Sequence, residues 1–135
     1  MGLIHSDMIE VKLVKGKGRG VFARRAIFEG EIIERVPVVT LPVADIKNAE
    51  GWVGLAGYCF HWGDGKVALA LGYGSLYNHS YQPNARYDDV GRLTKVFSAL
   101  RDIKAGEEIT VNYNGEPTDK EPMGFLVVET PAQTQ

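Results

Sequence analysis

The chain of 135 residues is long enough for one domain that buries roughly two-thirds of the surface its unfolded form would expose. With 44% hydrophobic and 24% charged residues, it has the composition of an ordinary folded protein, which excludes a chain dominated by disorder. The formal net charge of −2 lacks the basic excess that nucleic-acid backbones require, so we expect no direct nucleic-acid partner.

The cysteine and histidine content predicts a chain without a disulfide or a bound metal. Cys59 is the single cysteine, and the three histidines are too scattered to provide the ligand spacing of a zinc site. No apolar run of 18 residues is present, and residues 1–30 lack the apolar stretch of an export signal. We therefore expect an intracellular protein that does not cross a membrane.

The first elements along the chain are two strands around a glycine-rich turn. Residues 8–14 alternate apolar and charged side chains, which predicts a half-buried strand, and residues 21–23 predict a short one. Between them, residues 15–20 carry three glycines at alternate positions, which permit positive φ and close approach of a ligand to backbone N–H groups. Taken alone, this segment is more simply a flexible basic turn.

The next part of the chain is interrupted by prolines. Residues 32–36 predict a strand, and Pro37 and Pro42 bracket a second strand, which we expect to be short or to lie at a sheet edge because proline donates no ladder hydrogen bond. Residues 44–57 mix small, polar and aromatic side chains and are compatible with a short helix. This is the most ambiguous stretch of the sequence.

Two hairpins and a final strand are predicted in the second half. Residues 58–62 and 66–71 flank a tight turn, residues 85–88 and 93–100 flank another, and residues 109–113 form the last strand. Many short strands separated by turns predict a mostly β domain built of small sheets.

The segment after Tyr113 differs in composition, with prolines among acidic residues. We expect a single domain over residues 1–135, with a core of about 8–114 and a tail over 115–130 that docks its apolar part on the body. The last five residues, 131–135, are predicted to be disordered.

Residues 74–84 are the most unusual stretch, because they place an amide, an imidazole, a hydroxyl and a second amide between apolar runs. Pro83 forces Gln82 out of helical geometry, and short polar side chains bond nearby backbone, so a kinked, self-hydrogen-bonded turn is predicted. Polar groups this close to a core must each find a partner.

Residues 78–84 resemble the Asn-His-Ser, Pro-Asn motif of SET-domain protein-lysine methyltransferases. Two further blocks resemble the same family: residues 17–23 its N-terminal Gly-x-Gly block, and residues 106–113 its C-terminal Glu-hydrophobic-Thr-x-x-Tyr block. A Gly-x-Gly alone is weak, but three blocks in the family's order are a specific signal.

The resemblance implies an S-adenosylmethionine-dependent enzyme that transfers methyl from the sulfonium to a lysine amine of a protein or peptide, a histone or another protein. It also implies a β-clip-like fold of several small curved sheets, short 3-10 or α segments and a knot-like C-terminal threading. Periodicity alone could not suggest that threading, because threaded chains are rare.

The family motifs also imply roles for individual residues. Tyr113 occupies the position of the catalytic tyrosine, whose hydroxyl lies beside the transferring methyl; alone, it would be taken for a structural tyrosine. Cofactor contacts are implied for Gly18, Arg19, Gly20, Asn78 and His79. His79 also fits a core histidine bonded to a neighbouring carbonyl. A tail aromatic covers the cofactor in zinc-free members, and Phe125 would fill that position unless it only covers core.

An apolar channel for the substrate lysine is the remaining requirement. Deprotonating a lysine at pH 7 costs roughly 4.6 kcal/mol, and desolvation of the cation lowers that cost. Tyr58, Tyr87 and Tyr77 are the candidates for the channel wall, although Tyr58 fits a strand-core aromatic nearly as well. Val111 stands where many relatives carry the aromatic that limits methylation, which leaves the number of methyls open.

Departures from the family pattern narrow the prediction. Tyr81 stands where many members have cysteine, and cysteine-rich extensions are missing, so a zinc-free member similar to minimal bacterial and viral SET proteins is expected. Substrate recognition then lies within the domain or at a homodimer interface, in the cytoplasm of a bacterium or in a nucleus. Two alternatives stay open: a SET-like peptide- or cofactor-binding module with weak turnover, and a structural β domain used for assembly.

Overall fold

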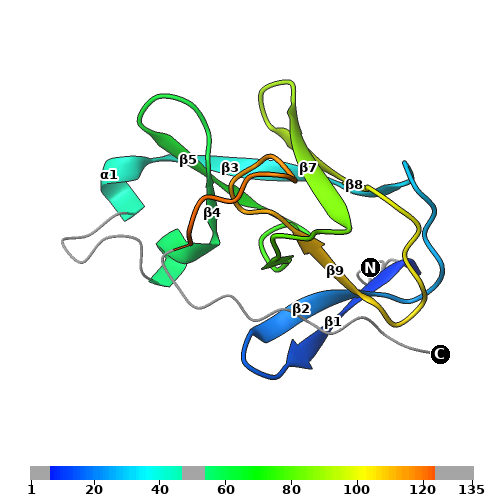
Figure 1. Ribbon diagram of the computed structural model, residues 1–135. Helices are drawn as coiled ribbons and strands as arrows, with labels where there is room; N and C mark the ends of the chain where they lie inside the picture. The colour runs from blue at the N-terminus through cyan, green and yellow to red at the C-terminus, as the bar shows by residue number, and fades with distance from the viewer. Residues whose placement is uncertain (1–6, 47–53, 124–135) are drawn as a thin grey trace, which may run out of the picture.

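The computed structural model describes residues 7–46 and 54–123, which form two small β-sheets (Figure 1). The four-stranded sheet has the order β1-β2-β9-β6. Its strands are β1 Ile9–Val14, β2 Gly18–Ala23, β9 Glu108–Val111 and β6 Asn78–His79. β6 runs parallel to β9, with Asn78 opposite Thr110, so the central segment lies beside the last strand.

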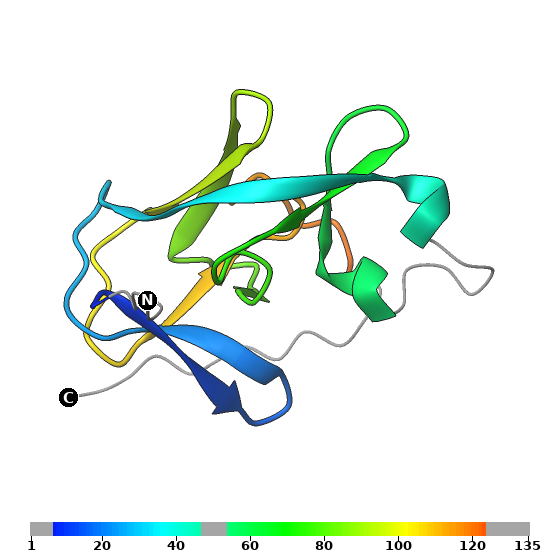
Figure 2. The ribbon, with the colours of Figure 1, turned by 180° about the vertical axis from the view of Figure 1, so that it is seen from behind.

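The second sheet has five antiparallel strands in the order β4-β5-β3-β8-β7. Seen from behind, the long strand β3 crosses the upper part of the molecule, above the β1–β2 hairpin (Figure 2). The strands are β4 Cys59–His61, β5 Lys66–Ala70, β3 Ile32–Pro42, β8 Thr94–Ala99 and β7 Ala85–Val90. Helical structure in the described residues is limited to α1 Val43–Ile46 and the 3-10 segment η1 Gly54–Tyr58.

Residues 38–42 form a ladder with β5 alone, which agrees with the edge position expected for the proline-bounded strand. The predicted division at Pro37 is wrong, because β3 is one continuous strand of 11 residues in the middle of the sheet order. It changes its main partner at Pro37: residues 32–37 pair with β8, and residues 38–42 pair with β5. The carbonyl of Pro37 accepts from the N–H of Leu71, which follows the end of β5. The proline therefore falls where one ladder ends and the other begins, and no bond is lost from the middle of a paired stretch.

The two sheets share one hydrophobic core. Val21 and Ile109 of the small sheet and Val38 and Phe97 of the large sheet are buried in the same cluster. Side chains buried to this degree each contribute roughly 1.5–3 kcal/mol. The loops after β2 and after β8 are also bonded to each other: Ile27 and Ile103 form a reciprocal backbone pair, with N···O distances of 2.9 and 2.7 Å.

The other predicted elements are confirmed with shifted bounds. Tyr58 belongs to η1 and precedes the strand in which it was expected. The central segment contains the short strand β6, followed by the predicted self-bonded turn, in which the Ser80 hydroxyl accepts from the N–H of Gln82 at 2.9 Å. No helix in the described parts of the chain is long and apolar enough to span a bilayer. The expected docking of the tail at Phe125 falls outside the described residues.

Candidate functional site

A cavity of about 270 Å³ lies where the glycine turn, the central segment and Tyr113, two residues after β9, meet. Three segments far apart in the sequence thus face one space, as the motifs predicted. Its lining also includes η1 and the residues before β6. The lining residues are Lys17, Gly18, Arg19, Gly57, Tyr58, Ser75, Leu76, Asn78 and Tyr113.

The glycine turn opens one wall of this cavity. Gly18 has φ +81°, and no atom lies within 4 Å of the place where its Cβ would stand, so a ligand can approach the main chain here. Gly20 has another purpose. A Cβ there would stand 2.5 Å from Oε2 of Glu108 and 2.8 Å from Nδ2 of Asn78, so Gly20 makes room for that side-chain pair and is absent from the cavity lining.

Asn78 ties the glycine turn to the last strand. Its Nδ2 donates to the carbonyl of Arg19 at 3.0 Å and to Oε2 of Glu108 at 2.8 Å. The other carboxylate oxygen of Glu108 accepts from Nζ of Lys17 at 3.0 Å, and both charged side chains are almost fully enclosed, with 6% and 1% of their surface exposed. Charge-assisted bonds of this kind are stronger than neutral ones, so the cluster fixes this wall of the cavity.

His79 supports the backbone of Tyr113. Its Nδ1 accepts from the N–H of Tyr113 at 3.0 Å, and the imidazole lies edge-on to the ring of Tyr81 at 4.5 Å. The bond runs opposite to the expected one, because the histidine accepts from an N–H where a bond to a carbonyl was predicted. His79 is buried and is absent from the cavity lining, so it acts on the site through Tyr113.

Tyr113 directs its hydroxyl back into the fold. The O–H donates to the carbonyl of Tyr77 at 2.6 Å, although 39% of the residue surface remains exposed. Desolvation, and then the nearby Glu108 carboxylate, raise the pKa of Tyr113 to about 12. At neutral pH the side chain is therefore an uncharged phenol, suited to orienting groups by hydrogen bonding.

Tyr58 and Tyr87 both lie near Tyr113. Tyr58 lines the cavity and is about half exposed. Tyr87 is outside the lining, but its O–H donates to the carbonyl of Tyr113 at 3.2 Å. Desolvation, and then Asp89, raise the pKa of Tyr87 to about 12, so it too stays neutral at physiological pH.

The side chain of Tyr77 lies in the core, which does not support its predicted place in a lysine channel. It is 2% exposed, stacks on Phe97 with a ring separation of 4.4 Å, and donates to Oε1 of Glu34 at 2.8 Å. Burial, and then Glu34, raise the pKa of the phenol. Its carbonyl, as the acceptor for Tyr113, is its contribution to the site. Phe125, the predicted cover of the cofactor, is outside the described residues.

Sequence reasoning missed several residues of the site. Lys17 and Glu108 belong to the first and third motif blocks, but their pairing across 91 positions carries no local signal. Ser75 and Leu76 line the cavity from the start of the central segment, and Gly57 from η1. For Ser75 and Leu76, the position directly before the Asn-His-Ser motif is the signal that could have suggested them.

In the described parts of the chain, no three His, Cys, Asp or Glu side chains gather in an arrangement that could hold a metal ion. Cys59 is a free thiol, and desolvation raises its pKa above the usual value, so it is not activated as a nucleophile.

Comparison with known proteins gives three concordant matches. The SET domain family matches residues 18–114. A histone-lysine N-methyltransferase of Schizosaccharomyces pombe, specific for lysine 37 of histone H3, is 34% identical over 106 residues, which cover 78% of this chain and 72% of that protein. The crystal structure of a candidate histone methyltransferase of Plasmodium falciparum is similar with a TM-score of 0.65 and 28% identity, over 81% of this chain and 95% of that one.

Proposed function

The chain belongs to the SET-domain family and is a protein-lysine methyltransferase, and we propose that it uses S-adenosylmethionine and modifies a histone lysine. One observation carries this proposal beyond the family assignment: the glycine turn, Asn78 and Tyr113 line a single cavity. A structural β domain would need no such convergence of polar groups around an open space.

The cavity wall fits S-adenosylmethionine in its chemistry. Gly18 leaves the main chain accessible, and Lys17, Ser75 and Asn78 bring polar atoms suited to a zwitterionic amino-acid end. Leu76 and Tyr58 offer apolar surface for a flat base. When bound, the cofactor supplies a methyl group on a sulfonium. The backbone of Gly18 and Arg19 and the side chain of Asn78 are the groups we assign to holding it.

Tyr113 is the residue that we assign to aligning the reacting groups. Methyl transfer to an amine is an in-line displacement, so the enzyme contributes mainly by orientation. The phenol stays protonated at neutral pH, and its bond to the Tyr77 carbonyl fixes the direction of the oxygen. It therefore acts as a fixed dipole beside the reacting atoms and is not the base that deprotonates lysine.

Tyr58 and Tyr87 are proposed as the walls that a substrate lysine would meet. Both lie near Tyr113: Tyr58 lines the same cavity, and Tyr87 is bonded to the carbonyl of Tyr113. Aromatic walls desolvate the ammonium and lower the pKa of the lysine, which increases the fraction of neutral, nucleophilic amine. The fixed tyrosines also limit the directions from which the amine can approach.

The proposal of a histone substrate rests on the relatives. One is described as specific for histone H3 and the other as a candidate histone methyltransferase. A net charge of −2 is compatible with a basic substrate, although it is small. A histone substrate would place the protein in a nucleus. We also propose that the domain binds no zinc.

Transfer of radiolabelled methyl groups to recombinant histones tests the proposal. We expect wild type to label a histone, Tyr113→Phe to label it at least about tenfold more slowly, and Tyr73→Phe, a tyrosine outside the cavity lining, to match wild type. Calorimetry should show that all three proteins bind S-adenosylmethionine. Absence of labelling by wild type across histones and a panel of cellular proteins would favour a binding module.

A further inference from the structure

Lys95 of β8 is a charged residue in the interior of the large sheet, with 1% of its surface exposed. Its Nζ lies 4.1 Å from the ring centroid of Phe60, 4.2 Å from that of Tyr87 and 5.3 Å from that of Trp62. Nζ also donates to Oδ1 of Asp89 at 2.6 Å. A buried ammonium is costly without partners, and here three aromatic faces and one carboxylate provide them.

The rings around Lys95 come from opposite edges of the sheet. Phe60 is on β4 and Tyr87 is on β7, which are the first and last strands in the order β4-β5-β3-β8-β7. Even so, their ring centroids are only 5.0 Å apart, in an edge-to-face arrangement. The sheet is therefore curled until its two edge strands face each other, and the ammonium of Lys95 lies against both facing rings.

Both edge strands lead directly to the proposed lysine channel. Tyr87 donates its O–H to the carbonyl of Tyr113. Phe60 is two residues after Tyr58, which lines the cavity at the end of η1. Because Tyr58 directly precedes β4, we expect a change in the distance between β4 and β7 to move Tyr58 relative to the Tyr87–Tyr113 pair.

We propose that Lys95 is a positioning residue, whose ammonium holds the Phe60 and Tyr87 rings together and so sets the width of the lysine channel. This inference rests on the proposed roles of Tyr58, Tyr87 and Tyr113. An apolar side chain of the same length could fill the space but would not attract two ring faces and a carboxylate at once. Loss of the Lys95 ammonium would let β4 and β7 separate and would weaken binding of the substrate lysine.

The test compares Lys95→Met, which keeps the length and removes the charge, with Lys95→Arg, which keeps the charge. With a histone peptide, we expect Lys95→Met to raise the peptide KM about tenfold, with a smaller change in kcat and with affinity for S-adenosylmethionine within twofold of wild type. Lys95→Arg should restore most of the peptide affinity. A general folding defect would instead change cofactor affinity and kcat together.

A second measurement does not depend on activity. In spectra of protein labelled with ¹³C at tyrosine Cζ, Lys95→Met should shift the signal of Tyr113 as well as that of Tyr87, and leave Tyr73 unchanged. If Lys95→Met does not fold, Asp89→Asn replaces it and is judged by the same criteria. This substitution weakens the ion pair with Lys95 at a side chain that is half exposed.

The outcomes separate the two proposals. A folded Lys95→Met protein with wild-type peptide KM and an unshifted Tyr113 signal would overturn the positioning role while leaving the enzyme assignment intact. If wild type labels no histone, the histone proposal fails, and the tyrosine spectra alone decide on Lys95.

Discussion

Nδ1 of His79 accepts a hydrogen bond from the backbone N–H of Tyr113, with a nitrogen–nitrogen distance of 3.0 Å. The histidine is buried on β6, and the tyrosine follows β9 by two residues. The ring centroids are 5.3 Å apart. The imidazole therefore holds the main chain at the point from which the phenol extends to the cavity.

Replacing His79 should slow methyl transfer without abolishing cofactor binding. His79→Ala removes the acceptor of a partly buried N–H, so we expect kcat to fall about tenfold and stability to fall by about 1 kcal/mol. His79→Asn can place an oxygen near the position of Nδ1 and should retain more activity than alanine. Steady-state kinetics and urea denaturation measure both effects. Equal kcat in His79→Ala and wild type would contradict the positioning role.

Local chemistry made much of this site predictable. Each of the three motif blocks is a short-range pattern that can be recognised from neighbouring residues alone. Each block contributes at least one residue to the cavity lining: Gly18, Asn78 and Tyr113. The β1–β2 and β7–β8 hairpins were predictable for the same reason: residues 8–14 alternate, and a short turn closes each hairpin.

The features that could not be predicted depend on contacts between distant segments. Pro37 predicts a strand end from sequence alone. The strand continues because β8 pairs with the residues up to Pro37 and β5 pairs with the residues after it. Tyr77 is predicted to line the channel because it is aromatic, yet its hydroxyl bonds to Glu34, 43 residues away. The charge of Lys95 is typical of a surface residue, although strand alternation places Lys95 on the same face as Phe97, and both are buried.

The pH dependence of methyl transfer should follow the substrate lysine and not Tyr113. A phenol with its pKa raised to about 12 stays neutral up to pH 10, whereas the lysine amine becomes neutral as pH rises. We expect kcat/KM to increase from pH 7 to 10, by up to about tenfold per unit, with no falling limb from the tyrosine. Tyr113→Phe should show the same rise at a lower rate. A fall near pH 8 that disappears in that variant would contradict this assignment.

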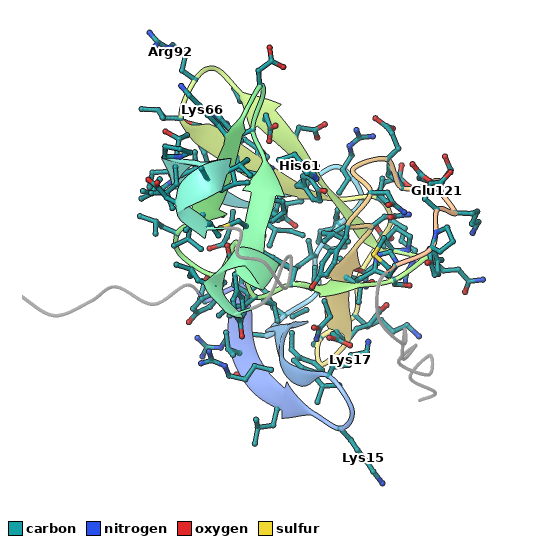
Figure 3. The ribbon with its side chains drawn as sticks, turned by 90° about the vertical axis from the view of Figure 1, so that its left-hand side faces the viewer. Lys15, Lys17, His61, Lys66, Arg92 and Glu121 are labelled. Carbon is teal, nitrogen blue, oxygen red and sulfur yellow. The ribbon has the colours of Figure 1, made fainter. Side chains whose placement is uncertain are left out.

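The buried ion pair between Lys17 and Glu108 should contribute to stability, whereas Lys15, on the same turn, should not. Lys15 extends into solvent from the tip of the β1–β2 hairpin (Figure 3), but the Lys17 ammonium is 3.0 Å from the carboxylate of Glu108. Lys17→Met leaves a buried carboxylate without its cation, so we expect a loss of about 3 kcal/mol in the free energy of unfolding and weaker binding of S-adenosylmethionine. Lys15→Met is the matched control and should change neither. Similar unfolding midpoints for the two variants would show that the pair contributes little.

The hydroxyl of Tyr81 should hold the segment after β9 against the body. It donates to the carbonyl of Glu121 at 3.0 Å and accepts from the N–H of Met123 at 3.1 Å, while Nδ2 of Asn114 donates to the same Glu121 carbonyl. Tyr81→Phe removes both hydroxyl bonds and keeps the ring beside His79. We therefore expect amide exchange over residues 117–123 to accelerate about tenfold, with exchange in β8 unchanged, as measured by mass spectrometry. Tyr73→Phe is the control. Unchanged exchange in that segment would mean that other contacts, such as those of Asn114 and of Lys120 with the Tyr81 carbonyl, are enough to hold it in place.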